Sequence, residues 1–176
     1  MIVRPTYVVG PFDHTGRFAR WVDRIARGGM VACPGPAGNP MQLIDARDQA
    51  SRVVGLAERR IPGAIHSCSP EPPWSFGDML AGIRLALSAD AEFRWRDPAE
   101  VGSAPFSLWT PEAEGVLALS PAAARATGLS PRPFVETVRD TAAWMVTADW
   151  HRDGVGGDSD DEARLLTAST GEWAEG

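Results

Sequence analysis

The sequence predicts an α/β fold in which buried strands alternate with amphipathic helices. Its 176 residues, 44% of them apolar, are enough for one domain with a substantial core. The first run of the chain, residues 2–9, is nearly continuous in apolar and β-branched residues, which is typical of a strand covered on both faces of a parallel sheet. Further short strands are expected over residues 41–44 and 64–67. Stretches with apolar side chains at helical spacing lie between and after these strands.

The first run is expected to bend at Pro5, because proline cannot donate to a strand ladder. A strand buried on both faces also needs neighbours on both edges. If nothing covers these edges, we expect the chain to form a homodimer or to pair with another chain through them. Gly10-Pro11 ends the run.

The next elements follow from the same periodicities. Residues 17–27 form an expected helix whose inner face is Phe18, Trp21, Val22 and Ile25. A short strand over 30–33, a turn-rich loop over 34–40 and a strand over 41–44 lead to a helix over 45–60. Asp45 and Asp48 begin that helix, and we interpret both as helix-capping residues.

The strand over 64–67 leads into Pro70 to Pro73, which we expect to form a rigid loop. Ser75 to Asp78 resembles a capping box and predicts a helix through Leu87. Residues 92–96 alternate in polarity, as in a half-exposed strand. Beyond them, Phe106, Leu108 and Trp109 either line a pocket together with Trp74 or fill the open side of the core.

The last expected elements are a helix over 121–127 and a longer one from Pro133 to about Ala148. We therefore place one domain over residues 1–150 and a flexible acidic tail over residues 151–176. The tail holds seven carboxylates against two arginines, so it accounts for most of the net charge of −6.

Composition excludes several classes of function. The rest of the chain is about neutral, which argues against a nucleic-acid partner. Cys33 and Cys68 are too few and too far apart for a disulfide framework, and no metal-ligand spacing occurs, so no metal site is predicted. Neither a membrane-spanning window nor a signal-peptide pattern is visible, so we expect no membrane partner and a cytoplasmic location.

The sequence contains no lysine, and its only tyrosine is Tyr7. A Tyr-x-x-x-Lys pair, Schiff-base chemistry and a P-loop lysine are therefore excluded within this chain. No glycine-rich dinucleotide fingerprint joins a strand to a helix either. We predict no catalytic residue.

Three segments resemble the extended short-chain dehydrogenase/reductases, in the NAD-dependent epimerase/dehydratase branch. They are Arg-Pro-Thr-Tyr-Val-Val-Gly-Pro-Phe-Asp at 4–13, Gln-Leu-Ile-Asp-Ala-Arg-Asp-Gln-Ala at 42–50, and the seventeen residues from Gly128 to Trp144. The resemblance implies the C-terminal portion of a Rossmann-type fold with its substrate-binding lobe. The glycine fingerprint and the catalytic pair of the family would then lie upstream of Met1.

The resemblance also implies roles for single residues. Pro5, Thr6 and Val8 would lie beside the nicotinamide of NAD or NADP, bound only with a complementing N-terminal half. The substrate would contact the loop from Phe12 to Arg17, including His14, and the pocket of Trp74 and Trp109.

Met41 stands where relatives that act on nucleotide sugars commonly have arginine, so a small molecule other than a nucleotide sugar is expected as substrate. The alternative is a free-standing small-molecule-binding or partner-interaction module derived from the same fold.

Overall fold

A computed structural model describes residues 1–101, 106–110, 117–148, 150 and 159–167. It has the predicted α/β architecture, and most elements lie within one or two residues of the expected bounds. In chain order the elements are β1 (Ile2–Pro5), β2 (Tyr7–Val9), α1 (Arg17–Ala26), β3 (Gly29–Pro34), β4 (Pro40–Asp45), α2 (Ala46–Glu58), β5 (Ala64–Ser67), β6 (Ser69–Ser75), α3 (Phe76–Leu87), β7 (Ala91–Arg96), α4 (Pro98–Val101), α5 (Ala122–Ala126), α6 (Phe134–Thr147) and α7 (Ser159–Thr167).

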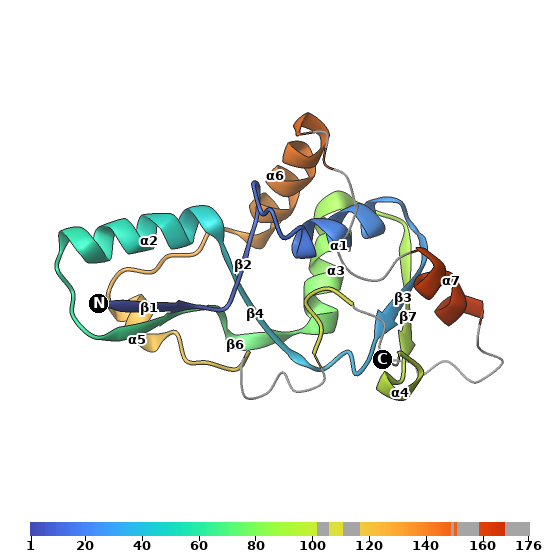
Figure 1. Cartoon of the computed structure of the whole chain (residues 1–176), viewed down its shortest axis with the longest axis horizontal. Helices are drawn as coiled ribbons and strands as arrows, with labels where there is room; N and C mark the ends of the chain where they lie inside the picture. The colour runs from blue at the N-terminus through green and yellow to red at the C-terminus, as the bar shows by residue number, and fades with distance from the viewer. Residues whose placement is uncertain (102–105, 111–116, 149, 151–158, 168–176) are drawn as a thin grey trace.

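The described strands form three small sheets. β1 pairs in parallel with β5, and β3 pairs in parallel with β7. β4 lies between β2, its parallel neighbour, and β6, its antiparallel neighbour. Figure 1 shows the β2–β4–β6 sheet in the middle of the molecule, with the β1–β5 pair at one end and the β3–β7 pair at the other. The chain therefore has two ends joined by a central sheet.

The predicted bend near Pro5 is confirmed, and it changes the partner of the chain. β1 runs beside β5 as far as Pro5, and the amide of Thr6 still donates to the carbonyl of Ser67 (3.2 Å). From Tyr7 onward the backbone instead pairs with Leu43 on β4. One apolar run thus serves two sheets.

The expectation that this run is buried on both faces is wrong. Ile2 is 56% exposed and Val8 is 38% exposed. β1 and β2 are edge strands of small sheets, with a hydrogen-bonded neighbour on one side only among the described residues, so fewer surrounding side chains are available to cover them. The apolar character of these strands therefore remains partly open to solvent.

The rigid loop expected from Pro70 to Pro73 is instead part of strand β6. β6 lies at the edge of its sheet, where proline is tolerated at positions whose N–H would face away from β4, and its ladder with β4 is irregular between Met41 and Leu43. The buried Gln42 on β4 supports it, because its amide donates to the carbonyls of Pro70 (3.1 Å) and Leu119 (2.8 Å). The prolines of this segment predicted a loop, but its position at the edge of a sheet allows it to form a strand.

Two hydrophobic cores lie at the two ends. The larger is built from the inner faces of α1 and α3 and the β3–β7 pair, with Phe18, Trp21 and Phe76 among its buried members. The smaller packs Leu56 of α2 and Ala124 of α5 around Ile65 of β5. In the view of Figure 1, α2 lies above β1 and α5 lies below it. Cys33 and Cys68 are free and buried.

Within the segment predicted as an acidic tail, residues 159–167 form helix α7. The Glu162 carboxylate accepts from Nε of Arg24 (2.7 Å) and from the amide of Ala32 on β3 (3.2 Å). Leu165 is fully buried. This part of the acidic segment thus packs against the edge of β3, at the right of Figure 1.

Among the described residues, no helix combines the length and the apolar character that crossing a membrane requires.

Candidate functional site

A pocket of about 330 Å³ lies beside the central β2–β4–β6 sheet, next to the start of α2 and the segment that leads into α6. β4 and β6 supply its apolar side, with Leu43, Ile44 and Trp74. The start of α6 closes it with Phe134, whose ring packs edge-on against Trp74 with centroids 4.9 Å apart. We call this cavity the Trp74 pocket. Small-molecule sites are typically concave and mostly apolar, with a few polar groups, and they occur preferentially between structural units.

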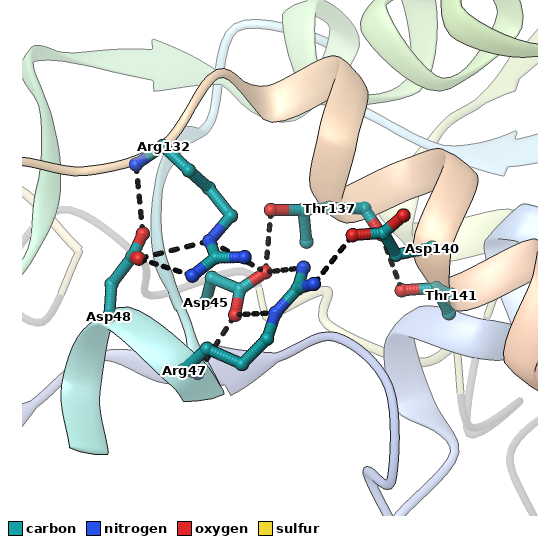
Figure 2. Close-up of polar contacts among 7 residues, drawn as sticks. All are labelled: Asp45, Arg47, Asp48, Arg132, Thr137, Asp140 and Thr141. Carbon is teal, nitrogen blue, oxygen red and sulfur yellow. Dashed lines mark hydrogen bonds and ion pairs between the residues drawn. The ribbon is translucent and has the colours of Figure 1, made fainter. Parts of the chain in front are cut away.

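The polar side of the Trp74 pocket is a network of carboxylates and arginines, drawn in Figure 2. Asp45 is almost completely buried, and its side chain caps the N-terminus of α2 by accepting from the amide of Arg47 (2.8 Å). The Arg47 guanidinium folds back onto the same carboxylate (2.9 and 2.7 Å), and the Thr137 hydroxyl donates to it (2.8 Å). The capping role predicted for Asp45 is confirmed.

Asp48 has a different role from the one expected. It lies in the first turn of α2, but its carboxylate accepts from the backbone amide of Arg132 (2.9 Å) and from Nε and Nη2 of the same residue (2.9 and 2.8 Å). The bidentate pair fixes the segment before α6 against α2, since a planar guanidinium matches a carboxylate in geometry. Arg132 also lies 3.5 Å from Asp45. The network therefore joins residues 45–48 to residues 132–140.

Burial acts to raise the pKa of the Asp45 carboxyl, but the hydrogen bonds from Arg47 and Thr137 outweigh it and hold the pKa below its ordinary value of 3.8. Asp45 is therefore ionised near neutral pH and cannot deliver a proton as a general acid there. Gly10, at φ 123°, lies close to this carboxylate. A Cβ added at Gly10 would lie 3.3 Å from Oδ2 of Asp45, which is too tight for a side chain unless the carboxylate shifts. The network thus holds the pocket wall in place.

The structure brings one of the predicted substrate residues, Trp74, to this pocket. Trp109 and Phe106 instead pack against the larger core, and the Phe106 ring stacks on Trp21. Leu108 is buried there as well. Phe106, Leu108 and Trp109 therefore follow the second alternative and help to fill the core. Trp74 follows the first alternative and lines a pocket.

The other predicted substrate residues lie outside the lining of the Trp74 pocket. Phe12 is 81% exposed, has φ 67° and packs its ring against Trp144 of α6 (5.9 Å). His14 is exposed in the turn before α1, and Arg17 is exposed at the first position of that helix. Their predicted contact with substrate stays a prediction.

The predicted cofactor residues lie one strand away from the pocket. Val8 on β2 is opposite Ile44 on β4, which lines the pocket, while Pro5 and Thr6 lie at the bend between β1 and β2. The Thr6 hydroxyl is buried without a hydrogen-bond partner in the described part of the chain. Met41 is fully buried in the larger core and does not line the pocket.

Sequence reasoning missed Arg47, Arg132 and Thr137 as site residues. All three lie within the segments 42–50 and 128–144 that carried the resemblance. The first segment carries acidic residues and the second carries basic and hydroxyl residues, and this complementarity was the signal in the sequence that could have indicated a contact between them. Among the described residues, no group of three or more histidine, cysteine, aspartate or glutamate side chains is arranged to hold a metal ion.

The geometry defines a class of fold: an α/β chain with parallel strands, a bent first strand and a pocket beside its central sheet. This fold is shared with solved NAD(P)-dependent epimerases and related enzymes, which confirms the predicted partial Rossmann-type fold of the extended short-chain dehydrogenase/reductases. No protein-family model and no curated protein matches the sequence.

Three solved structures illustrate the likeness. The GDP-L-fucose synthetase of Naegleria fowleri bound to NADP has a TM-score of 0.61 at 16% identity, over 84% of this chain. The UDP-glucose 4-epimerase of Thermotoga maritima with UDP-glucose has a TM-score of 0.62 at 14% identity, also over 84%. The UDP-glucose 4-epimerase of Thermus thermophilus with NAD has a TM-score of 0.56 at 19% identity, over 83%. The chain spans 46% of the length of each of these proteins.

Proposed function

We propose that this chain supplies the substrate-binding part of an NAD(P)-dependent epimerase, dehydratase or reductase, with the Trp74 pocket as its substrate site. The observation that carries the proposal is the position of the pocket, beside the central sheet of a fold shared with NAD- and NADP-bound enzymes. The Val8 strand, expected to face the nicotinamide, borders the pocket strand β4.

The chemistry of the pocket supports binding rather than proton transfer. Its two carboxylates, Asp45 and Asp48, are each held by arginines. The chain contains no lysine, so the tyrosine–lysine pair of the family would come from a complementing N-terminal half. We therefore propose that hydride transfer requires that half and that this chain alone is inactive.

A pocket of about 330 Å³ lies at the lower end of the range for small-molecule sites. This volume supports a substrate smaller than a nucleotide sugar. The proposed reaction class is oxidation or reduction at a carbon that bears a hydroxyl or carbonyl group.

The test is to join this chain to an N-terminal half that carries a glycine fingerprint and a Tyr-x-x-x-Lys helix. NAD(P)H turnover is then followed by absorbance with a panel of hydroxyl- and carbonyl-bearing compounds. We expect turnover with the joined protein and none with the chain alone. A joined protein that folds and binds NAD(P) but turns over no compound of the panel would count against the proposal.

Trp74→Ala is expected to raise the KM of the joined protein at least tenfold, because the indole supplies a large part of the apolar pocket wall. The matched control is Trp150→Ala, which removes an indole outside the lining of the pocket. Equal effects of the two substitutions on KM would place the substrate elsewhere.

A second candidate function is a binding module that pairs with a copy of itself. The exposed apolar side chains of Ile2 and Val8, on strands with one paired edge in the described part of the structure, favour it. We expect light scattering after size exclusion to give about twice the chain mass of 18.9 kDa.

Val8→Lys should return such a dimer to a monomer, because a charge on an edge strand opposes pairing. Val146→Lys, at an exposed site on α6, should leave the dimer intact. A stable, monodisperse wild-type monomer would contradict this second function.

A further inference from the structure

A second pocket, of about 290 Å³, lies between α2 and the turn that follows α5. α2 contributes Arg52 and Arg59, and the turn contributes Thr127, Gly128 and Ser130. We call it the Arg52 pocket. Asp48 is at the boundary of both cavities, but the apolar residues that define the Trp74 pocket do not line this one.

Two guanidinium groups converge on one carbonyl oxygen in the Arg52 pocket. Arg52 donates from Nη1 to the carbonyl of Thr127 and from Nη2 to the hydroxyl of the same residue. Arg59 donates from Nη1 to the same carbonyl (2.9 Å). A guanidinium offers five N–H donors, so most donors of both groups remain for another acceptor.

Arg52 is only 6% exposed, and its Nε has no hydrogen-bond partner within the described residues. No carboxylate of the described part forms an ion pair with Arg52 or Arg59. A buried cation without a counter-charge is costly, and a second cation beside it adds to the cost. Burial and the charge of Arg59 both lower the pKa of Arg52. The direction of this shift agrees with a cation that lacks a compensating negative charge.

The groups already present compensate these charges incompletely. The Thr127 carbonyl ends α5 and carries only a partial negative charge. The Asp48 carboxylate lines the pocket, but both of its oxygens accept from Arg132. The hydroxyls of Ser51 and Ser130 also line the cavity and offer further donors.

We propose that the Arg52 pocket binds a small anionic metabolite through a phosphoryl or carboxylate group held between Arg52 and Arg59. Guanidinium groups bind such oxyanions in a bidentate geometry and remain charged at all physiological pH values. The pocket volume suits a small molecule and is close to the lower limit for such sites. This site is separate from the proposed substrate site and does not depend on the proposed reaction.

The test is isothermal titration of the full chain with inorganic phosphate and, in a second arm, with succinate. Both titrations are run at constant ionic strength against potassium chloride. We expect saturable 1:1 binding of at least one of the two anions and none of chloride. A preference for phosphate assigns a phosphoryl group to the ligand, and a preference for succinate assigns a carboxylate.

Arg59→Gln is expected to weaken this binding at least tenfold, because it removes a charge-assisted hydrogen bond to the anion, and it does so at an exposed residue. Arg60→Gln is the matched control. It makes the same charge change at the adjacent exposed position, outside the pocket lining, and should leave binding unchanged.

Trp74→Ala should also leave anion binding unchanged, so failure of the proposed function and failure of this inference are distinguishable. Arg52→Gln serves as a second variant, with circular dichroism to verify its fold. Absence of saturable binding of either anion would overturn the inference. Equal weakening by Arg59→Gln and Arg60→Gln would overturn it too, because it would show a general charge effect.

Discussion

Asp45→Asn is expected to lower the free energy of unfolding by about 3 kcal/mol, because it removes the buried charge to which Arg47 and Thr137 donate. The carboxylate holds Arg47 through two hydrogen bonds and accepts from the Thr137 hydroxyl. An asparagine keeps one acceptor oxygen for the helix cap but turns an NH₂ group toward these donors. Urea denaturation followed by circular dichroism measures the loss.

Asp140→Asn is the matched control for this measurement. Asp140 contacts the same guanidinium, with 2.5 Å between its Oδ2 and Nη1 of Arg47, but its side chain is 48% exposed. Exposed ion pairs contribute at most about 1 kcal/mol, so the control should lose far less stability. Similar losses in the two variants would show that burial of Asp45 is not what makes its charge important.

The same substitution should change the response to acid. The pKa of Asp45 is lower in the folded chain than its ordinary 3.8, so its contribution to stability is complete above that value. The contribution is lost as the pH falls through the folded pKa, below 3.8. Asp45→Asn should therefore flatten the decline of unfolding free energy in that acidic window. An unchanged slope in the variant would assign the acid sensitivity to other carboxyls.

Phe76→Ala is expected to cost about 3 to 5 kcal/mol of stability, the usual range for removing a buried aromatic side chain. Phe76 is fully buried at the start of α3, and its ring packs edge-on against Trp21 (5.5 Å) and Trp95 (6.2 Å). The cavity would open at the centre of the larger core, where helix α1 and strand β7 meet α3. The midpoint and slope of denaturant unfolding report the change.

Leu85→Ala, on the same helix, provides the comparison. Leu85 is 80% exposed, so its truncation should change the free energy of unfolding by less than about 0.5 kcal/mol. If Phe76→Ala cost under about 1 kcal/mol, the larger core would have collapsed around the missing ring, contrary to the close packing of the aromatic cluster.

The sequence predicted the longer helices before residue 148 well because their apolar spacing is a local property, but it predicted neither α4 nor α7. α1, α2, α3 and α6 begin and end within one or two residues of the expected positions. Capping by Asp45 and by the Ser75–Asp78 box was also visible locally. Strand β6 was missed because its prolines signal a loop, and only the edge position and the support from Gln42 explain a strand there.

The candidate site was predicted only in part, because it is assembled from distant segments. Trp74 and Trp109 carry similar sequence signals, yet one lines a pocket and the other packs against the core. Which of them stays accessible depends on the position of α6, whose Phe134 meets Trp74. The partners of Asp48 were equally beyond local reasoning, since Arg132 lies 84 residues further along the chain.

The separation between the two halves of this network affects how the protein is made. At typical translation rates of 5 to 20 residues per second, Arg132 follows Asp48 out of the ribosome about 4 to 17 s later. During that interval the nascent chain carries the acidic start of α2 without the arginine that fixes it. Because Arg132 and Thr137 arrive together with α6, emergence of this one helix supplies both the charge partners and the wall of the pocket. The site is therefore among the last parts of the described domain to take shape as the chain is synthesised.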